Sequence, residues 1–176
     1  MENKKSNFWE EMGKPFVVLV VICLVASFLL GVANDVTKPV IEANAAAAAE
    51  ATRKSVLPAA TSFAEVAVPE GVNADSIFVD EGGAGYVVTS SGYGYHGNIP
   101  VTNGFDADGK VVALEANVSS ETQGVGSRAG QASFLDKFVG LSGSADGVDT
   151  LTSATYSSGA VRQAVSDAMA ALEAVK

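Results

Sequence analysis

The sequence is poor in the residues that build disulfides and metal centres. It contains a single cysteine, Cys23, and a single histidine, His96. One cysteine excludes an intrachain disulfide, and it cannot supply an iron–sulfur cluster or a cysteine-rich zinc site from this chain alone. We therefore expect no metal ligands and no catalytic residues of that kind. Cys23 is interpreted as a small apolar filler and His96 as a turn residue.

Basic residues are also scarce, with 11 Lys and Arg against 20 Asp and Glu and a net charge of −9. Residues 1–33 hold three basic and three acidic residues, so the whole excess of negative charge falls after residue 33. An acidic domain of this kind does not attract nucleic acid or anionic lipid. Nucleic acid is therefore not expected as a partner.

Residues 16–33 form a continuous, mostly apolar run without charge. A transmembrane helix needs about 20 mostly apolar residues, so we predict a short segment over 1–15 and a transmembrane helix over 16–36. A cleaved signal peptide has a shorter apolar core, about 7–15 residues, and a small-x-small cleavage site. The residues that follow Ala33 offer a poor site of that kind. A buried core helix is disfavoured because the run has no polar face.

The charges beside this run predict the orientation in the membrane. Lys4, Lys5 and Lys14 precede it, whereas only Lys38 lies close behind it. By the positive-inside rule, the N-terminus is cytoplasmic and the following domain lies on the extracytoplasmic side of the cell (inner) membrane, with a single crossing. Trp9 stands where interfacial aromatic residues are common.

A helical stalk is predicted over residues 37–60, because residues 40–56 are rich in Ala, Glu, Lys and Arg. Pro58 is expected to end it. The remaining residues, 61–176, form the predicted globular domain. Its extended or alternating stretches are residues 63–68, 76–80, 86–90, 99–105 and 111–119, with turns at 91–94 and 106–109.

The helices of this domain are predicted from spacing. Phe134, Leu135 and Phe138 share one face of a short helix over 133–139. A final amphipathic helix follows, which we expect Ser157 or Ser158 to cap. Strands and helices mix without a regular strand–helix–strand repeat, so the predicted fold class is α+β. In the strand 111–119, Val112, Leu114, Ala116 and Val118 are predicted to face the core.

The most specific pattern lies at residues 149–158, where an acid, several hydroxyls and two small residues precede the final helix. The run Asp149-x-x-Thr152-Ser153-Ala154-Thr155 resembles the flavin-attachment signature of FMN-binding subunits in membrane redox pumps, Asp-x-x-(Ser/Thr)-(Gly/Ser)-Ala-Thr. The resemblance implies that Thr155 carries FMN through a phosphoester bond. Without it, the same residues would suit an ordinary Ser/Thr-rich loop before a helix.

The resemblance also implies how the flavin is attached and held. A separate flavin transferase supplies the base and metal that a threonine hydroxyl needs, and Asp149 serves its recognition or the local turn. Ser153 and Ala154 keep the approach open, with Ser153 where glycine is commonest. The phosphate is expected ahead of the final helix, with Ser157 and Ser158 adding hydroxyl donors.

Other stretches resemble the same family in the same order. Residues 121–126 are similar to its Glu-Thr-Pro-Gly-Leu-Gly loop, in which backbone N–H groups and glycines lie against the flavin; Gln123 replaces the proline. Residues 133–140 and 91–101 are similar to two further family segments. The loop residues expected at the cofactor are Glu121, Thr122, Gly124, Val125 and Gly126. Tyr156 is expected either to pack on the flavin or to fill the core.

The whole pattern resembles the G subunit of Rnf-type ion-translocating ferredoxin:NAD oxidoreductases. The C subunit of the sodium-pumping NADH:quinone reductase shares the motif but is usually longer. This resemblance implies an electron-relay subunit with covalent FMN, no independent turnover, and other pump subunits as partners. The alternatives are a free-standing membrane-anchored FMN domain in extracellular electron transfer, a pilin-like structural protein and a binding domain without flavin. The pilin reading is disfavoured because residues 16–33 contain no acid.

Overall fold

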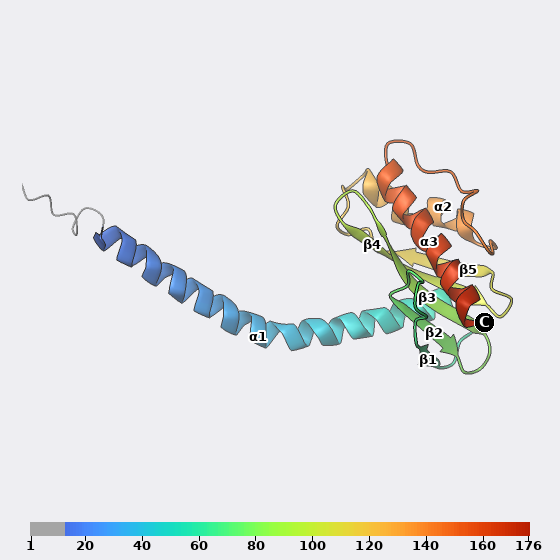
Figure 1. The fold of residues 1–176 in the computed structure, drawn as a ribbon, viewed down its shortest axis with the longest axis horizontal. Helices are drawn as coiled ribbons and strands as arrows, with labels where there is room; N and C mark the ends of the chain where they lie inside the picture. Colours follow the sequence, from blue (N-terminus) through green and yellow to red (C-terminus); the bar gives the residue numbers. More distant parts are fainter. Residues whose placement is uncertain (1–12) are drawn as a thin grey trace, which may run out of the picture. The chain divides into compact units, whose positions relative to one another are not determined.

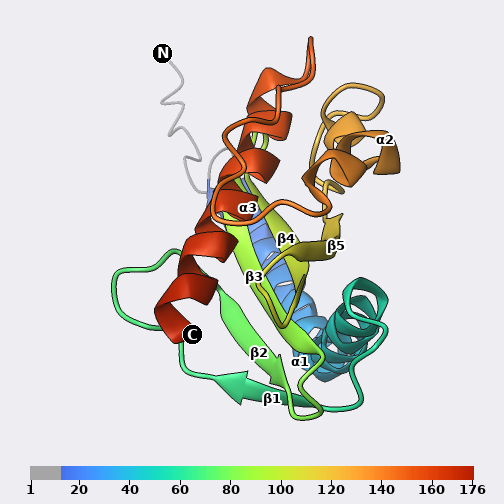
Figure 2. The same ribbon diagram turned by 90° about the vertical axis from the view of Figure 1, so that its right-hand side faces the viewer.

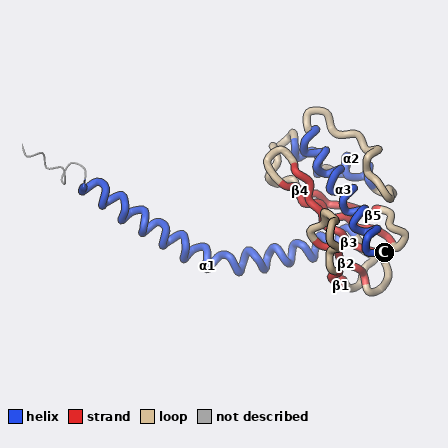
Figure 3. The backbone as a smooth tube through the Cα atoms, in the orientation of Figure 1, coloured by secondary structure: helices blue, strands red, loops and turns tan. Residues whose placement is uncertain are grey.

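The computed structural model describes residues 13–176. The chain begins with a long helix, continues through five consecutive strands and closes with short helices and one longer helix (Figures 1 and 3). Strands and helices are segregated along the sequence, which is typical of α+β proteins. The predicted fold class is confirmed. The chain forms two compact units, of which the first ends at Ala48 and the second is Ala49–Lys176.

Helix α1, Lys14–Val56, is uninterrupted. One stretch of it is long and apolar enough to cross a membrane, and none of that stretch is buried in the structure. Pro39 lies inside the helix, where its missing N–H removes one backbone hydrogen bond without ending the helix. The helix stops at Val56, because the residue before Pro58 is disfavoured in the α conformation. The predicted stalk is therefore helical only as far as residue 56.

Several predictions for the N-terminus concern residues outside the described part of the chain. These are the charges of Lys4 and Lys5, the interfacial position of Trp9 and most of the segment 1–15. Lys14 begins α1, and Cys23 is exposed on the apolar stretch of the same helix.

The second unit is built on one antiparallel sheet (Figure 2). Consecutive strands pair as neighbours in the order β1-β2-β3-β4-β5, so the sheet is a simple meander. The tight turn predicted at residues 106–109 joins β4 to β5, and Gly109 there has a φ of +88°. The strands are β1 Phe63–Val66, β2 Ser76–Asp80, β3 Gly85–Tyr93, β4 Asn98–Asp106 and β5 Val111–Ala116.

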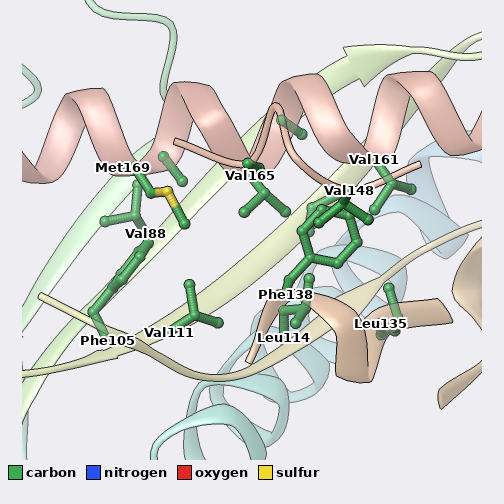
Figure 4. Close-up of a cluster of buried hydrophobic side chains, with 14 of the residues drawn as sticks. Val88, Phe105, Val111, Leu114, Leu135, Phe138, Val148, Val161, Val165 and Met169 are labelled. Atoms are coloured by element: carbon green, nitrogen blue, oxygen red, sulfur yellow. The ribbon is translucent and has the colours of Figure 1, made fainter. Parts of the chain in front are cut away.

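Helix α3, Thr155–Val175, covers one face of this sheet and packs mainly on β3 and β4 (Figure 2). Its apolar residues recur every three or four positions, which places them on one stripe. Val161, Val165 and Met169 from this stripe belong to the buried core cluster that also contains Val88 and Phe105 (Figure 4). The short helices η2 Gly126–Gly130, α2 Ala132–Leu135 and η3 Asp136–Phe138 complete the layer. Phe134, Leu135 and Phe138 are buried there, as their spacing predicted.

The opposite face of the sheet is covered locally by the last turn of α1. Val56 and Leu57 are buried against Val87 of β3. Gly104 of β4 allows this approach, because a Cβ at Gly104 would lie 2.1 Å from the Val56 carbonyl oxygen. The end of α1 is thus part of the globular unit, and the two layers fix β3 and β4 from both sides.

Two details of the strands differ from the predictions. Residues 91–93 continue β3, and the turn lies at 94–97 instead, closed by the N–H of Gly94 donating to the Gly97 carbonyl at 2.7 Å. In β5 the alternation is broken. Gly104 pairs with Ala113 but Phe105 pairs with Val111, so Val112 is the extra residue of a β-bulge. Val112 is 40% exposed, and its predicted place in the core was wrong.

Candidate functional site

A cleft opens beside the first turn of α3. Its volume is about 200 Å³, below the range of about 300–1,000 Å³ for sites that enclose most of a small molecule, so it is a small and open cleft. Three segments far apart in the sequence supply its walls: the loop between β3 and β4, the loop 121–126 and the residues around the start of α3. We call it the α3 cleft. Its lining consists of Tyr95, Glu121, Thr122, Val125, Gly126, Ser153, Ala154, Thr155, Tyr156 and Ser157.

The carboxylate of Glu121 joins the three walls. Its side chain is buried, with 6% exposure. Oε1 accepts the backbone N–H groups of Tyr95, at 3.1 Å, and His96, at 3.0 Å. Oε2 accepts the hydroxyl of Ser157 at 2.5 Å. The β3–β4 loop and the first turn of α3 therefore both bond to the loop 121–126 through one side chain.

Two glycines leave room for this carboxylate. A Cβ on Gly94 would lie 2.7 Å from Oε1 of Glu121, and a Cβ on Gly126 would lie 2.7 Å from Oε2. Both distances are shorter than real Cβ contacts, so a side chain at either position would require the Glu121 carboxylate to move from its place. Gly126 was predicted to allow the close approach of a ligand. In the structure its close neighbours are Glu121 and the Ser157 hydroxyl.

The environment of Glu121 favours its charged form. Burial by itself would raise the pKa of this carboxyl, because a charge loses solvation in the interior. The hydrogen bonds from Ser157, His96 and Tyr95 outweigh that effect, and the pKa of Glu121 lies below its ordinary value of 4.5. The cleft therefore holds one fixed negative charge at neutral pH. Within residues 13–176, no Lys or Arg forms an ion pair with it.

The segment before α3 is a four-residue turn over 151–154. The N–H of Ala154 donates to the Leu151 carbonyl at 3.0 Å. Ser153, the third residue of the turn, has a φ of +68°, which makes it the sole described residue other than glycine with a positive φ. Glycine is the residue that adopts this conformation without strain. The need for a positive φ explains why a small residue suits this position in the motif.

Thr155 is the first residue of α3, and its side chain is exposed at the cleft. Among the described residues its hydroxyl has no hydrogen-bond partner. Ala154 precedes the helix, and no side chain caps the first turn of α3. The predicted cap by Ser157 or Ser158 was wrong, because both lie inside the helix. A free hydroxyl thus stands at a helix N-terminus whose first N–H groups are not satisfied by a capping side chain.

Ser157 and Ser158 are buried and use their hydroxyl protons within the protein. Ser157 donates to Glu121, as described above. Ser158 Oγ donates to the Ala154 carbonyl at 2.7 Å and accepts the N–H of Leu151 at 2.9 Å. Ser158 therefore fastens the 151–154 turn to α3 from behind the cleft. In this structure neither hydroxyl offers a proton to a ligand, contrary to the donor role predicted for them.

The loop 121–126 is held mainly by its own backbone. The N–H of Val125 donates to the Thr122 carbonyl, and the N–H of Gly124 donates to Ser127 Oγ at 2.9 Å. These two N–H groups are therefore occupied in this structure, and the contact between the loop backbone and a flavin ring stays a prediction. Gly124 has a φ of +78° and is not part of the cleft lining.

Two further residues of the predicted site lie outside the lining. Thr152 is exposed in the 151–154 turn. Asp149 is exposed and lines a separate shallow hollow together with Lys137 and Val148. Thr155 and Asp149 therefore line two different hollows of the domain.

The sequence did not indicate Tyr95 as a site residue, and it left two roles open for Tyr156. Both side chains line the cleft and both are largely exposed, at 66% and 73%. Filling of the core is thereby excluded for Tyr156. His96 lies in the β3–β4 turn beside Tyr95, as predicted for a turn residue.

The residues that line the cleft suit a neutral, planar ligand. Two tyrosines and Val125 offer apolar surface, and Glu121 is the sole lining residue that is charged at neutral pH. The hydroxyl of Thr155 is exposed at the same cleft. These residues fit FMN, whose ring is planar and whose phosphate forms esters. No group of three or more His, Cys, Asp or Glu within residues 13–176 is placed to hold a metal ion.

Comparison with known proteins agrees with this geometry. Residues 94–170 match the family described as FMN-binding domain, and they include the β3–β4 loop, the loop 121–126 and most of α3. The chain is also similar to the G subunit of the Na⁺-translocating ferredoxin:NAD⁺ oxidoreductase complex of Acetobacterium woodii. The two are 28% identical over 150 residues, covering 76% of this chain and 72% of the relative. Residues 94–170 are therefore similar to FMN-binding domains, and most of the chain is similar to the G subunit of an Rnf-type complex.

Proposed function

We propose that the protein is a membrane-anchored electron carrier that holds one FMN in a phosphoester bond to Thr155. The observation that carries this proposal is the free hydroxyl of Thr155 at the edge of the α3 cleft, inside the segment that matches the FMN-binding domain. Threonine is a poor nucleophile at neutral pH, and the one carboxylate of the lining, Glu121, is bonded to Ser157, Tyr95 and His96 and not to the Thr155 hydroxyl. Attachment therefore requires a second protein.

That second protein is a flavin transferase that uses FAD. The Thr155 oxygen attacks the phosphorus on the flavin side of FAD, the bond between the two phosphates breaks, and AMP leaves. The hydroxyl proton passes to a base of the transferase. The product is the FMN ester of Thr155. The exposed position of Thr155, one residue after a tight turn, leaves room for such an enzyme to approach.

The start of α3 suits the negative charge of the product. A helix N-terminus carries unsatisfied N–H groups and about half a positive charge. Because no side chain caps α3, its first N–H groups would be available to hold the phosphate of FMN bound to Thr155. The attraction favours retention of the phosphate beside the cleft rather than in solvent.

The similarity to the Acetobacterium woodii G subunit supports a role for this chain in electron transfer. That protein is by name a subunit of a ferredoxin:NAD⁺ oxidoreductase complex. We propose that this chain likewise passes electrons between other redox subunits of an Rnf-type complex and has no turnover of its own. An extracytoplasmic position of the globular unit is supported by the positive-inside rule, because Lys4, Lys5 and Lys14 precede the apolar stretch and Lys38 alone closely follows it.

The test is the intact mass of the full chain purified in detergent from its native membranes. We expect a gain equal to one FMN less one water, and yellow-green fluorescence of the denatured band under ultraviolet light. Thr155→Ala should lose both, whereas Thr152→Ala, which removes an exposed hydroxyl three residues away, should keep both. An unmodified wild-type mass in cells that flavinylate other proteins would refute the covalent carrier.

A second measurement separates the pump subunit from a free-standing FMN domain. Co-purification of the flavinylated chain with other membrane redox subunits supports the Rnf-type assignment. Recovery of the flavinylated chain alone, under mild detergent conditions that keep other membrane complexes together, supports the free-standing carrier.

A further inference from the structure

Two exposed tyrosines from different parts of the chain meet at the α3 cleft. Tyr95 belongs to the loop between β3 and β4, and Tyr156 is the second residue of α3. Their ring centroids lie 6.4 Å apart with the planes tilted by 53°. Large aromatic side chains on a soluble surface commonly mark contact sites. The two rings therefore need an explanation that packing of the domain does not supply.

The positions of both rings are held by the backbone. The N–H of Tyr95 donates to the buried Glu121, and Ser157, next to Tyr156, donates to the same carboxylate. The two tyrosines thus stand on the two segments that Glu121 joins. Their rings remain free to turn, because they are 66% and 73% exposed, but their anchor points are fixed relative to each other and to Thr155.

We propose that Tyr95 and Tyr156 form the aromatic wall against which the isoalloxazine ring of FMN packs, which rests on the proposed attachment of FMN to Thr155. A tyrosine offers a flat apolar face with little side-chain entropy to lose, and aromatic rings attract each other in offset or tilted arrangements. Tyr156 directly follows Thr155, so the ring is tethered beside the wall. The negative charge of Glu121 disfavours an anionic occupant of the cleft and leaves the neutral ring as the group that fits.

Contact with the two tyrosines should change how freely the attached flavin ring moves. Each aromatic contact favours the docked ring over a freely tethered one by about 2- to 12-fold. A docked ring tumbles with the protein and is shielded from small quenchers, whereas a tethered ring in solvent moves independently. Fluorescence anisotropy and iodide quenching of the attached flavin report these two states.

The experiment compares three sets of variants of the full chain, flavinylated in cells and purified in detergent. The first is the double variant Tyr95→Leu with Tyr156→Leu, which removes both rings. The second is Tyr95→Phe with Tyr156→Phe, which keeps both rings. The matched control is Tyr93→Leu, because Tyr93 is 78% exposed and close in sequence but does not line the cleft. Intact mass confirms one FMN per chain in each sample, and far-ultraviolet circular dichroism confirms folding.

We expect the double leucine variant to lose flavin anisotropy and to gain iodide quenching, whereas the double phenylalanine variant and Tyr93→Leu match the wild type. Equal anisotropy and quenching in the leucine and wild-type proteins, with FMN attached to both, would overturn the aromatic wall and leave the covalent carrier intact. A phenylalanine variant as impaired as the leucine one would also overturn it. A wild-type protein without FMN refutes the attachment itself, so the two failures are distinct.

Discussion

Ser157 and Glu121 meet at 2.5 Å between hydroxyl and carboxylate, although 36 residues separate them in the sequence. The contact joins the helix that begins with Thr155 to the loop that forms another wall of the α3 cleft. Glu121 also holds the β3–β4 loop through Tyr95 and His96. One buried carboxylate therefore links the three walls of the cleft, in addition to the apolar packing of α3 on the sheet.

Ser157→Ala tests the strength of this link. Hydrogen bonds to a charged group contribute about 1.5–3 kcal/mol, and Glu121 would remain buried with only its two backbone donors. We expect the free energy of unfolding to fall by about that amount, measured by urea denaturation of the full chain. Ser133→Ala, at an exposed serine of α2, is the control and should change it by less than about 0.5 kcal/mol. Equal stability of the two variants would show that the hydrogen bond between Ser157 and Glu121 contributes little to the free energy of unfolding.

Acid should destabilise the domain through its buried carboxylates. The pKa of Glu121 lies below its ordinary value of 4.5, as described above, and that of Asp80 lies below 3.8, chiefly because the N–H of Ala84 bonds to it. A folded-state pKa below the unfolded one gives stability that is complete above the ordinary value. That stability is lost as the pH falls from the ordinary pKa towards the lower folded-state pKa.

We therefore expect the free energy of unfolding to be flat from pH 7 to about 5 and to fall below about 4.5. Urea denaturation at several pH values measures this profile. Glu121→Gln should flatten the part that belongs to Glu121, because glutamine does not titrate. Glu173→Gln, at an exposed position of α3, should leave the profile unchanged. A Glu121→Gln profile as steep as the wild type contradicts the assignment.

The fold was largely predictable because its elements carry local signals. Alternation predicted the strand that begins at residue 111, turn residues separated the other four extended stretches, and helical spacing predicted that Phe134, Leu135 and Phe138 share one face. The exceptions arise from pairing between strands. Val112 lies outside the core, contrary to its prediction, because of a bulge against β4. Residues 91–93 extend β3 because they pair with β4. No pattern within one segment contains that information.

The sequence predicted the part of the candidate site whose residues are contiguous in the chain. Thr155 and its neighbours form one motif, whereas Tyr95 reaches the cleft only because the β3–β4 loop folds against α3. The roles of Ser157 and Ser158 were mistaken for a similar reason. Serine near a helix start suggests a cap, but the turn at 151–154 begins the helix earlier and places both serines inside it.

Ser153 provides a test of that turn. Its φ of +68° strains any residue with a side chain, and a β-branched residue suffers most. Ser153→Val should lower the free energy of unfolding by about 1–2 kcal/mol and reduce the fraction of chains that carry FMN, measured by urea denaturation and intact mass. Ser153→Gly should retain both. Thr152→Val is the control at the neighbouring exposed position. A Ser153→Val protein as stable and as fully flavinylated as Thr152→Val would rule out the strained turn.

Gly92 tests whether α3 must lie close to β3 for the site to form. A Cβ at Gly92 would be 2.0 Å from the Ala160 carbonyl oxygen, and that oxygen belongs to the backbone of α3 and cannot rotate away. Gly92→Ala should therefore shift α3 together with Thr155 and Tyr156, lowering the free energy of unfolding by about 1–3 kcal/mol or more.

The same shift should reduce the fraction of chains that carry FMN, because the helix that presents Thr155 no longer closes the cleft. Urea denaturation and intact mass measure the two effects. Gly147→Ala is the matched control, since no atom lies within 4 Å of a Cβ there and Gly147 has no positive φ. If Gly92→Ala loses stability but keeps full flavinylation and wild-type flavin anisotropy, then close packing of α3 supports the fold alone, and the cleft tolerates a displaced helix.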